Sequence, residues 1–110
     1  MLKKSHRLTT AEFDQHFKVG KRFHSDHLQL IYVPQSRFNG AAVVGKKVHK
    51  KAVDRNKTRR RLYNALYQVN LAANLKGVFI LVAKPAAKNV GYKTIKLEIE
   101  DLLGRLSNKR

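Results

Sequence analysis

The sequence contains no cysteine and no tryptophan, and only 7 of its 110 residues are acidic. Without cysteine the chain can form neither a disulfide nor a thiolate zinc site. A two-metal nuclease needs several carboxylates at one point, so the scarcity of acidic residues argues against that class. No apolar run approaches the ~18 residues of a membrane span. The N-terminus lacks the apolar region of a signal peptide, and we expect a cytoplasmic protein.

Positive charge is what the sequence has in excess. Its 24 Lys and Arg residues give a formal net charge of +17. This imbalance indicates a polyanionic partner, most simply nucleic acid, with a basic membrane-surface protein as the alternative. Hydrophobic residues make up 43% of the chain, which is too many for a disordered tail. We expect a single domain over residues 1–110 with a modest core of its own.

Much of this charge lies in residues 46–61, where nine of sixteen side chains are Lys or Arg and only Asp54 opposes them. The residues that follow place apolar side chains at helical spacing, namely Leu62, Ala65, Leu66, Val69 and Ala73. This spacing predicts one packed helix over residues 52–75, with the charged run as its first turns. Like charges three and four residues apart repel, so an external polyanion is expected to stabilise this segment.

A second helix is predicted near the N-terminus. Thr9 and Glu12 have the spacing of a capping box, and the helix should continue to about Lys18. Phe13 and Phe17 lie four residues apart and so share one face. Two interpretations of this pair stay open: both rings belong to the core, or they floor a groove on which bases stack.

Three β-segments complete the pattern. Residues 28–33 and 78–83 are rich in strand formers, and the second run is apolar on both faces, as in a strand covered on both sides. A shorter apolar run at 41–44 follows an expected polar loop at 35–40. Phe23 belongs to an earlier strand or to the start of the first one.

A last helix follows an expected loop at 86–91. Its apolar residues recur at helical spacing and are expected to face the core, namely Ile95, Ile99, Leu102, Leu103 and Leu106. We expect the acidic residues Glu98, Glu100 and Asp101 on its solvated face. The five histidines, including a loose His24/His27 pair, are expected to be surface groups. Neither a nucleophile–base pair nor a phosphate-binding glycine loop is visible. The chain therefore looks like an α+β binding protein without catalytic or metal-ligating side chains of its own.

The central segment resembles the signature of the bacterial ribonuclease P protein subunit. The resemblance rests on Val43-Val44-Gly45-Lys46-Lys47 followed by Lys50-Lys51-Ala52-Val53-Asp54-Arg55-Asn56-Lys57-Thr58-Arg59-Arg60. Its hallmark is an Arg-Asn-Arg-like box that runs into a basic pair on a helix. The flanks agree, at Arg7-Leu8 with Phe13-x-x-x-Phe17 and at residues 79–83 with Lys84-Pro85.

This sequence departs from the family pattern at two positions. Lys57 stands where the box usually has Arg, and lysine cannot make the same bidentate contacts. Tyr63 stands where the family usually carries another Arg, so it either stacks instead or the contact is missing. The family also has an aromatic residue in the strand that lines its cleft. Tyr32 is the candidate here, although the register could equally place Ile31 there.

The resemblance implies a two-layer α/β sandwich, a four-stranded sheet with about three helices and an unusual left-handed βαβ crossover. It also implies a small basic partner for a large catalytic RNA, which removes the 5′ leader of precursor tRNA with RNA-bound Mg²⁺. No membrane and no obligate protein partner are expected. The alternatives are a structural RNA-binding protein of the ribosomal type and, more weakly, a metal-dependent nuclease.

Two sets of site residues follow from the resemblance. The catalytic RNA is expected to contact Lys46, Lys47, Lys50, Lys51, Arg55, Asn56, Lys57, Arg59 and Arg60. The cleft for the single-stranded leader is expected to be lined by Phe13, Phe17 and Tyr32.

Overall fold

The computed structural model describes residues 8–108, so the basic leader and Arg7 of the family pattern lie outside the described residues. In chain order the elements are α1 (Thr10–Val19), β1 (Lys21–His24), β2 (Leu28–Val33), β3 (Phe38–Val43), α2 (Ala52–Ala73), β4 (Gly77–Ala83), the 3₁₀ helix η2 (Pro85–Asn89) and α3 (Tyr92–Asn108). The predicted α+β fold with a four-stranded sheet and three α-helices is confirmed for this part of the chain.

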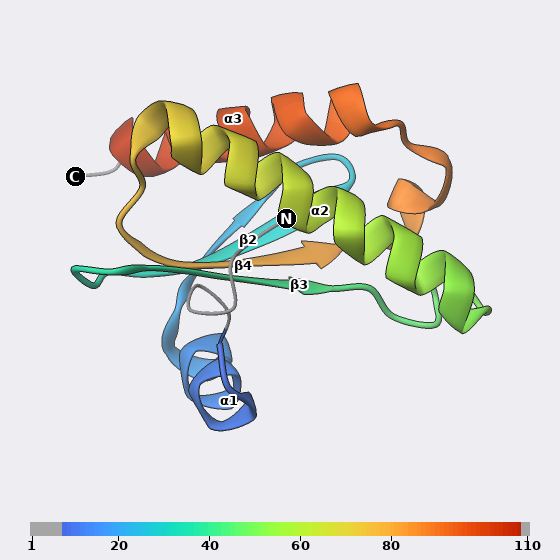
Figure 1. Ribbon diagram of the computed structural model, residues 1–110, viewed down its shortest axis with the longest axis horizontal. Helices are drawn as coiled ribbons and strands as arrows, with labels where there is room; N and C mark the ends of the chain where they lie inside the picture. Colours follow the sequence, from blue (N-terminus) through green and yellow to red (C-terminus); the bar gives the residue numbers. More distant parts are fainter. Residues whose placement is uncertain (1–7, 109–110) are drawn as a thin grey trace.

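The strands are ordered β1-β2-β4-β3, and only the β3–β4 pair is parallel. Helix α2 makes the crossover between these two strands. In Figure 1 the chain runs along β3 in the foreground, returns through α2 above the sheet and continues along β4 behind β3. This path is a left-handed crossover, as the resemblance implies, whereas almost all βαβ units are right-handed.

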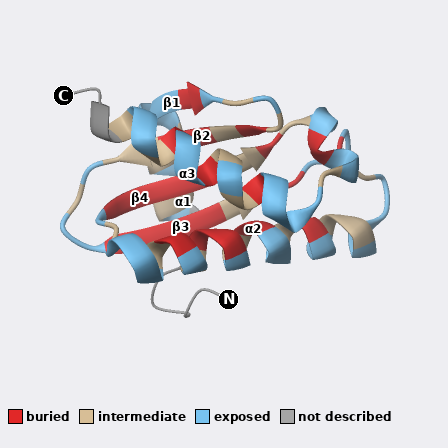
Figure 2. Cartoon of the chain, turned by 90° about the horizontal axis from the view of Figure 1, so that it is seen from above, coloured by how far each residue is buried: buried red, intermediate tan, exposed pale blue. Residues whose placement is uncertain are grey.

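Helices cover both faces of the sheet. α2 and α3 lie on one face, and α1 lies on the other, where it adds a short third layer to the two-layer sandwich that the resemblance implies (Figure 1). Because strand side chains alternate between faces, β4 contributes Phe79 and Leu81 to the core under α2 and α3, and Val78 and Ile80 to the core beside α1. The buried colour along β4 in Figure 2 confirms the prediction of a strand covered on both sides.

Helix α2 is oriented by its apolar stripe. Four of its five predicted core residues are buried, but Ala73 is exposed because the helix ends at this residue. Asn74 caps the helix in the left-handed conformation (φ 51°), and its N–H donates to the carbonyl of Asn70 at 2.7 Å. Asparagine tolerates this conformation, so the helix ends two residues earlier than predicted. Gly77 (φ 119°) lies beyond this cap and begins β4.

Two expected loops contain regular structure. β3 begins at Phe38, inside the predicted polar loop, because pairing with β4 starts at this residue. The polar residue Asn39 is buried in this strand, and its Oδ1 accepts a hydrogen bond from Gln35 Nε2 at 2.6 Å. The predicted loop at 86–91 overlaps η2, which is anchored by the buried Ala87. In both places the apolar residues are few and are interrupted by polar ones, so the hydrophobic pattern did not predict the start of β3 or the helix η2.

Glu98 was expected on the solvated face of α3, and this prediction is wrong. Its side chain is only 15% exposed, and it ties α3 to the β1–β2 turn. Oε1 accepts from Ser25 Oγ at 2.5 Å and from the His27 N–H at 3.0 Å, while Oε2 faces His27 Nδ1. Burial raises the pKa of Glu98, but the hydrogen bonds from Ser25 and His27 outweigh this effect and hold the pKa below its usual range. His27 is thus a partner in this contact rather than an ordinary surface group.

The Glu98 contact predicts a pH-dependent contribution to stability. A lowered folded-state pKa means that the stabilisation is present above the usual value of 4.5 and is lost as the pH falls through the folded pKa. We expect Glu98→Gln to lower the free energy of unfolding by about 1–3 kcal/mol at pH 7. The difference from the parent protein should shrink below about pH 4.5, because protonated Glu98 then resembles glutamine.

Urea unfolding between pH 7 and pH 3 measures this difference. Glu100→Gln is the matched control, because Glu100 is exposed on the same helix and should change the free energy by less than about 0.5 kcal/mol. A Glu98→Gln deficit that stays constant down to pH 3 would show that the carboxylate charge does not provide the stabilisation.

Candidate nucleic-acid interface

The basic box occupies the first turns of α2 and the loop that precedes them. The buried side chains of Thr58 and Leu62 fix how the helix is rotated on the sheet. As a result Asn56, Lys57 and Arg60 are exposed. Arg59 and Tyr63 lie beside the edge strand β3. At about 100° per residue, Asn56 and Arg60 follow them on the adjoining part of the helix surface, with Arg60 farthest from the buried stripe. Lys57 lies farther round the helix, away from β3.

The loop before α2 is held by main-chain contacts. Val48 is buried, and its N–H donates to the carbonyl of Gly45 at 3.1 Å. This turn leaves Lys46, Lys47, Lys50 and Lys51 exposed on one short segment.

Two of the box residues also make contacts within the protein. Arg55 is half-buried, and its Nη1 donates to the carbonyl oxygens of His49 at 3.1 Å and Lys50 at 2.7 Å. Arg59 Nη1 donates to Asn56 Oδ1 at 2.6 Å. Arg55 therefore fastens the lysine-rich loop to α2, a structural role that no pattern in the sequence indicates. The Asn56 contact positions the guanidinium of Arg59.

The aromatic pair of α1 stacks against the opposite face of the sheet. The ring centroids of Phe13 and Phe17 are 5.5 Å apart, with 29° between the ring planes. Both rings are half-buried against the core formed by Ile31, Ala41, Val78 and Ile80. The rings therefore pack on the sheet, as the core interpretation expects, and also keep an accessible side. A groove on which bases stack stays a prediction. Such half-exposed rings are suited to stacking on bases.

Arg22 is a member of this surface that the sequence reasoning missed. Its guanidinium carbon lies 4.7 Å from the centre of the Phe17 ring, and Nη2 donates to the Phe17 carbonyl at 2.7 Å. A cation over an aromatic face is attracted by the ring quadrupole. The sequence contained no local signal for this contact, because it depends on the β1–β2 register, in which Arg22 pairs with Ile31 and so shares its face of the sheet.

Tyr32 does not lie with the two phenylalanines. Its ring packs on Phe79, with the centroids 5.2 Å apart, in the core under α2 and α3. The neighbouring residue Ile31 lies on the α1 face, completely buried. The prediction that Tyr32 lines the same cleft as Phe13 and Phe17 is therefore wrong, because alternation along β2 sends adjacent side chains to opposite faces.

A cavity at the edge of β3 joins the two predicted surfaces. It has a volume of about 390 Å³ and is lined by Leu8, Thr9, Phe13, Ala41, Ala42, Val43, Val44, Arg59 and Tyr63. Its walls come from α1, from β3 and the residue after it, and from α2. Tyr63, whose role was left open, thus lines the same cavity as Phe13 and Arg59.

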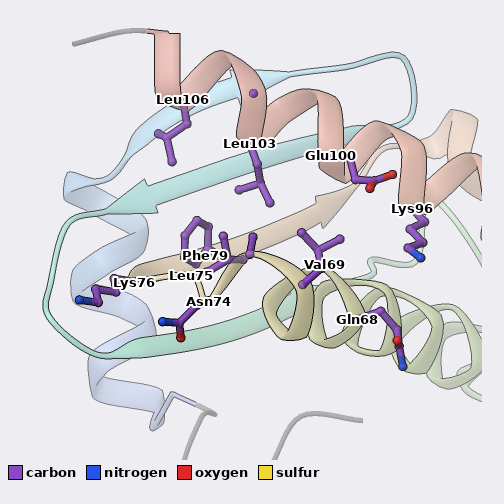
Figure 3. A pocket seen from close by; sticks show the side chains of 13 residues that line it. Gln68, Val69, Asn74, Leu75, Lys76, Phe79, Lys96, Glu100, Leu103 and Leu106 are labelled. Atoms are coloured by element: carbon purple, nitrogen blue, oxygen red, sulfur yellow. The ribbon is translucent and has the colours of Figure 1, made fainter.

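A larger cavity of about 620 Å³ lies between the C-terminal half of α2 and α3 (Figure 3). Its lining includes the apolar side chains of Val69, Phe79 and Leu103, with Lys96 and Glu100 on α3. None of the predicted RNA-binding residues lines this cavity. Its charges are of both signs, so it is a poorer candidate for phosphate binding than the box.

The assembled chemistry is that of a binding surface. Arginine and lysine side chains suit phosphates, and the half-exposed rings suit single-stranded bases. Within residues 8–108, no group of three or more His, Cys, Asp or Glu side chains is placed to hold a metal ion. No helix in the same range is long and apolar enough to cross a bilayer.

Sequence comparison identifies the relatives of this chain. The family model described as Ribonuclease P matches residues 2–107. The chain belongs to the ribonuclease P protein family. The ribonuclease P protein component of Nitratiruptor is 34% identical over 102 residues, covering 93% of this chain and 92% of the relative. That of Microcystis aeruginosa is 32% identical over 109 residues, covering 89% and 88%.

Solved ribonuclease P proteins share the fold. A Staphylococcus aureus mutant protein matches with a TM-score of 0.81 at 24% identity, covering 94% of this chain and 90% of that one. The Thermotoga maritima protein matches with a TM-score of 0.76 at 22% identity, covering 90% and 96%.

Gly20 sets the distance between α1 and the sheet of this ribonuclease P family member. A Cβ atom at this position would lie 2.4 Å from Ile31 Cγ2 and 3.0 Å from the His16 carbonyl oxygen. We expect Gly20→Ala to lower the free energy of unfolding by about 1–3 kcal/mol, because α1 must shift away from β2. Gly45→Ala is the control, since a Cβ there meets nothing within 4 Å. Equal urea midpoints for the two variants would contradict this close packing.

Proposed function

We propose that this chain is the protein subunit of ribonuclease P and assists endonucleolytic removal of the 5′ leader from precursor tRNA in the cytoplasm. The observation that carries the proposal is the meeting of two surfaces at the β3 edge. One is the cationic first half of α2, and the other is the stacked pair Phe13 and Phe17 on α1. A rigid basic helix suits a folded RNA, and an aromatic groove suits a single strand.

In this proposal the catalytic RNA binds the α2 surface. Lys46, Lys47, Lys50 and Lys51 extend that surface along the preceding loop, all of them exposed. Asn56, Lys57, Arg59 and Arg60 contribute from the helix itself. Arg55 acts mainly by holding the loop, because its guanidinium already donates to two carbonyl oxygens. The leader lies along α1 on Phe13 and Phe17, with Arg22 beside it to contact a phosphate.

The family resemblance assigns the hydrolytic step to Mg²⁺ held mainly by the RNA subunit and the substrate. The described side chains do not offer a site for this ion, because no three potential ligands converge. In this proposal the protein contributes by holding the leader and the catalytic RNA in a fixed relation. Such positioning lowers the barrier without a protein side chain that reacts.

The deciding experiment is leader removal by a bacterial ribonuclease P RNA at low Mg²⁺, with and without this protein. We expect strong stimulation, correct mature 5′ ends and no cleavage by the protein alone. Cleavage by RNA-free protein would favour a nuclease in its own right. Tight, salt-sensitive RNA binding without stimulation would favour a structural RNA-binding protein of the ribosomal type.

Arg60→Ala tests the α2 surface with little risk to the fold, because Arg60 is exposed. We expect catalytic-RNA binding to weaken by about 1–3 kcal/mol, since a charge-assisted phosphate contact is lost. The slope of log K against log salt should fall by about one unit. Lys76→Ala is the control, because it removes one exposed charge beyond the far end of α2. Equal losses in both variants would indicate a general effect of net charge.

A further inference from the structure

The cavity at the β3 edge has the walls of a base-binding site. Phe13 on α1 and Tyr63 on α2 contribute aromatic rings, and residues 41–44 contribute a floor of alanine and valine. Arg59 adds a guanidinium that its contact with Asn56 holds in place. The nine lining residues include no carboxylate that would repel a nucleotide. The cavity has a volume of about 390 Å³ and is open to solvent along one side, so a base can enter it without a change in the fold.

We propose that this cavity receives one unpaired nucleobase of the precursor tRNA leader. Stacking on Tyr63 makes binding of the leader depend on the presence of that base. The proposal rests on the proposed function, because it takes the leader to lie along α1. Phe13 belongs both to the stacked pair and to the cavity lining. A strand that passes over Phe17 and Phe13 is thereby led to the cavity mouth.

The physical chemistry favours a single strand as the source of the base. An aromatic and aliphatic cavity gains little from phosphates, whereas every nucleobase has a face that can stack. A paired base inside a helix cannot enter a cavity of this kind without unpairing, which costs a few kcal/mol. A leader strand is free of that cost. The Arg59 guanidinium at the wall can then contact the phosphate of the inserted nucleotide or the edge of its base.

The test uses the reconstituted holoenzyme and precursor tRNAs with one abasic nucleotide at each leader position in turn. The dissociation constant of each substrate is measured at one fixed salt concentration. With the parent protein we expect one leader position at which base removal weakens binding by about 10-fold. In Tyr63→Leu this position-specific loss should disappear, and in Tyr63→Phe, which keeps the ring, it should remain.

Tyr67→Leu is the matched control. Tyr67 is a half-buried tyrosine one turn further along α2 that packs on the same core, but it does not line the cavity. Its variant should keep the abasic profile of the parent protein. Melting curves of all variants separate loss of the ring from loss of the fold, and Tyr63→Phe keeps the test informative if Tyr63→Leu is unstable.

Two outcomes would overturn the base site. One is an unchanged abasic profile in Tyr63→Leu, and the other is a profile without any sensitive leader position in the parent protein. The same binding measurement is repeated with abasic substitutions in the catalytic RNA. If Tyr63 affects the dissociation constant only with these substitutions, and not with abasic leaders, the assignment of the base to the leader is overturned. In each case the stimulation of leader removal by the parent protein still decides the proposed function independently.

Discussion

Strand β4 is buried on both faces, and this constraint organises the rest of the molecule. Phe79 and Leu81 need a cover on one side, and Val78 and Ile80 need one on the other. Helices α2 and α3 provide the first cover, and α1 contributes to the second. Since β3 is the edge strand beside β4, α1 and α2 approach one another around it. The arrangement of both binding surfaces thus follows from the need to bury one central strand.

Packing against the sheet is what allows α2 to carry so much charge of one sign. Repulsion between like charges at helical spacing costs about 0.2–0.5 kcal/mol per pair. Burial of one leucine side chain contributes about 1.5–3 kcal/mol, and α2 buries Leu62 and Leu66 almost completely. Core packing therefore outweighs the repulsion in the absence of RNA. The helix that carries the basic face is thus folded without RNA, which under the proposed function reduces the entropy that binding must overcome.

Local patterns predicted the local structure well. The capping box of Thr9 and Glu12 forms as expected, with both reciprocal hydrogen bonds, and the apolar spacing of α2 predicted its buried face. The errors arose where distant segments decide the outcome. Tyr32 and Ile31 differ by one residue, and a one-residue change in register exchanges the two faces of a strand. Glu98 finds its partners 71 and 73 residues away, which helical periodicity on α3 cannot reveal.

The cavity at the β3 edge depends on small side chains in the edge strand. Ala41 packs toward α1 and Ala42 packs toward α2 and α3, so the strand passes between the two cores with little bulk on either side. A larger residue at either position would reduce the open space that Phe13 and Tyr63 line. The same small residues let α1 and α2 approach the edge closely enough to share a wall. A change of side-chain volume in β3 would therefore alter both proposed RNA-binding surfaces together, although β3 itself contributes no charge to either.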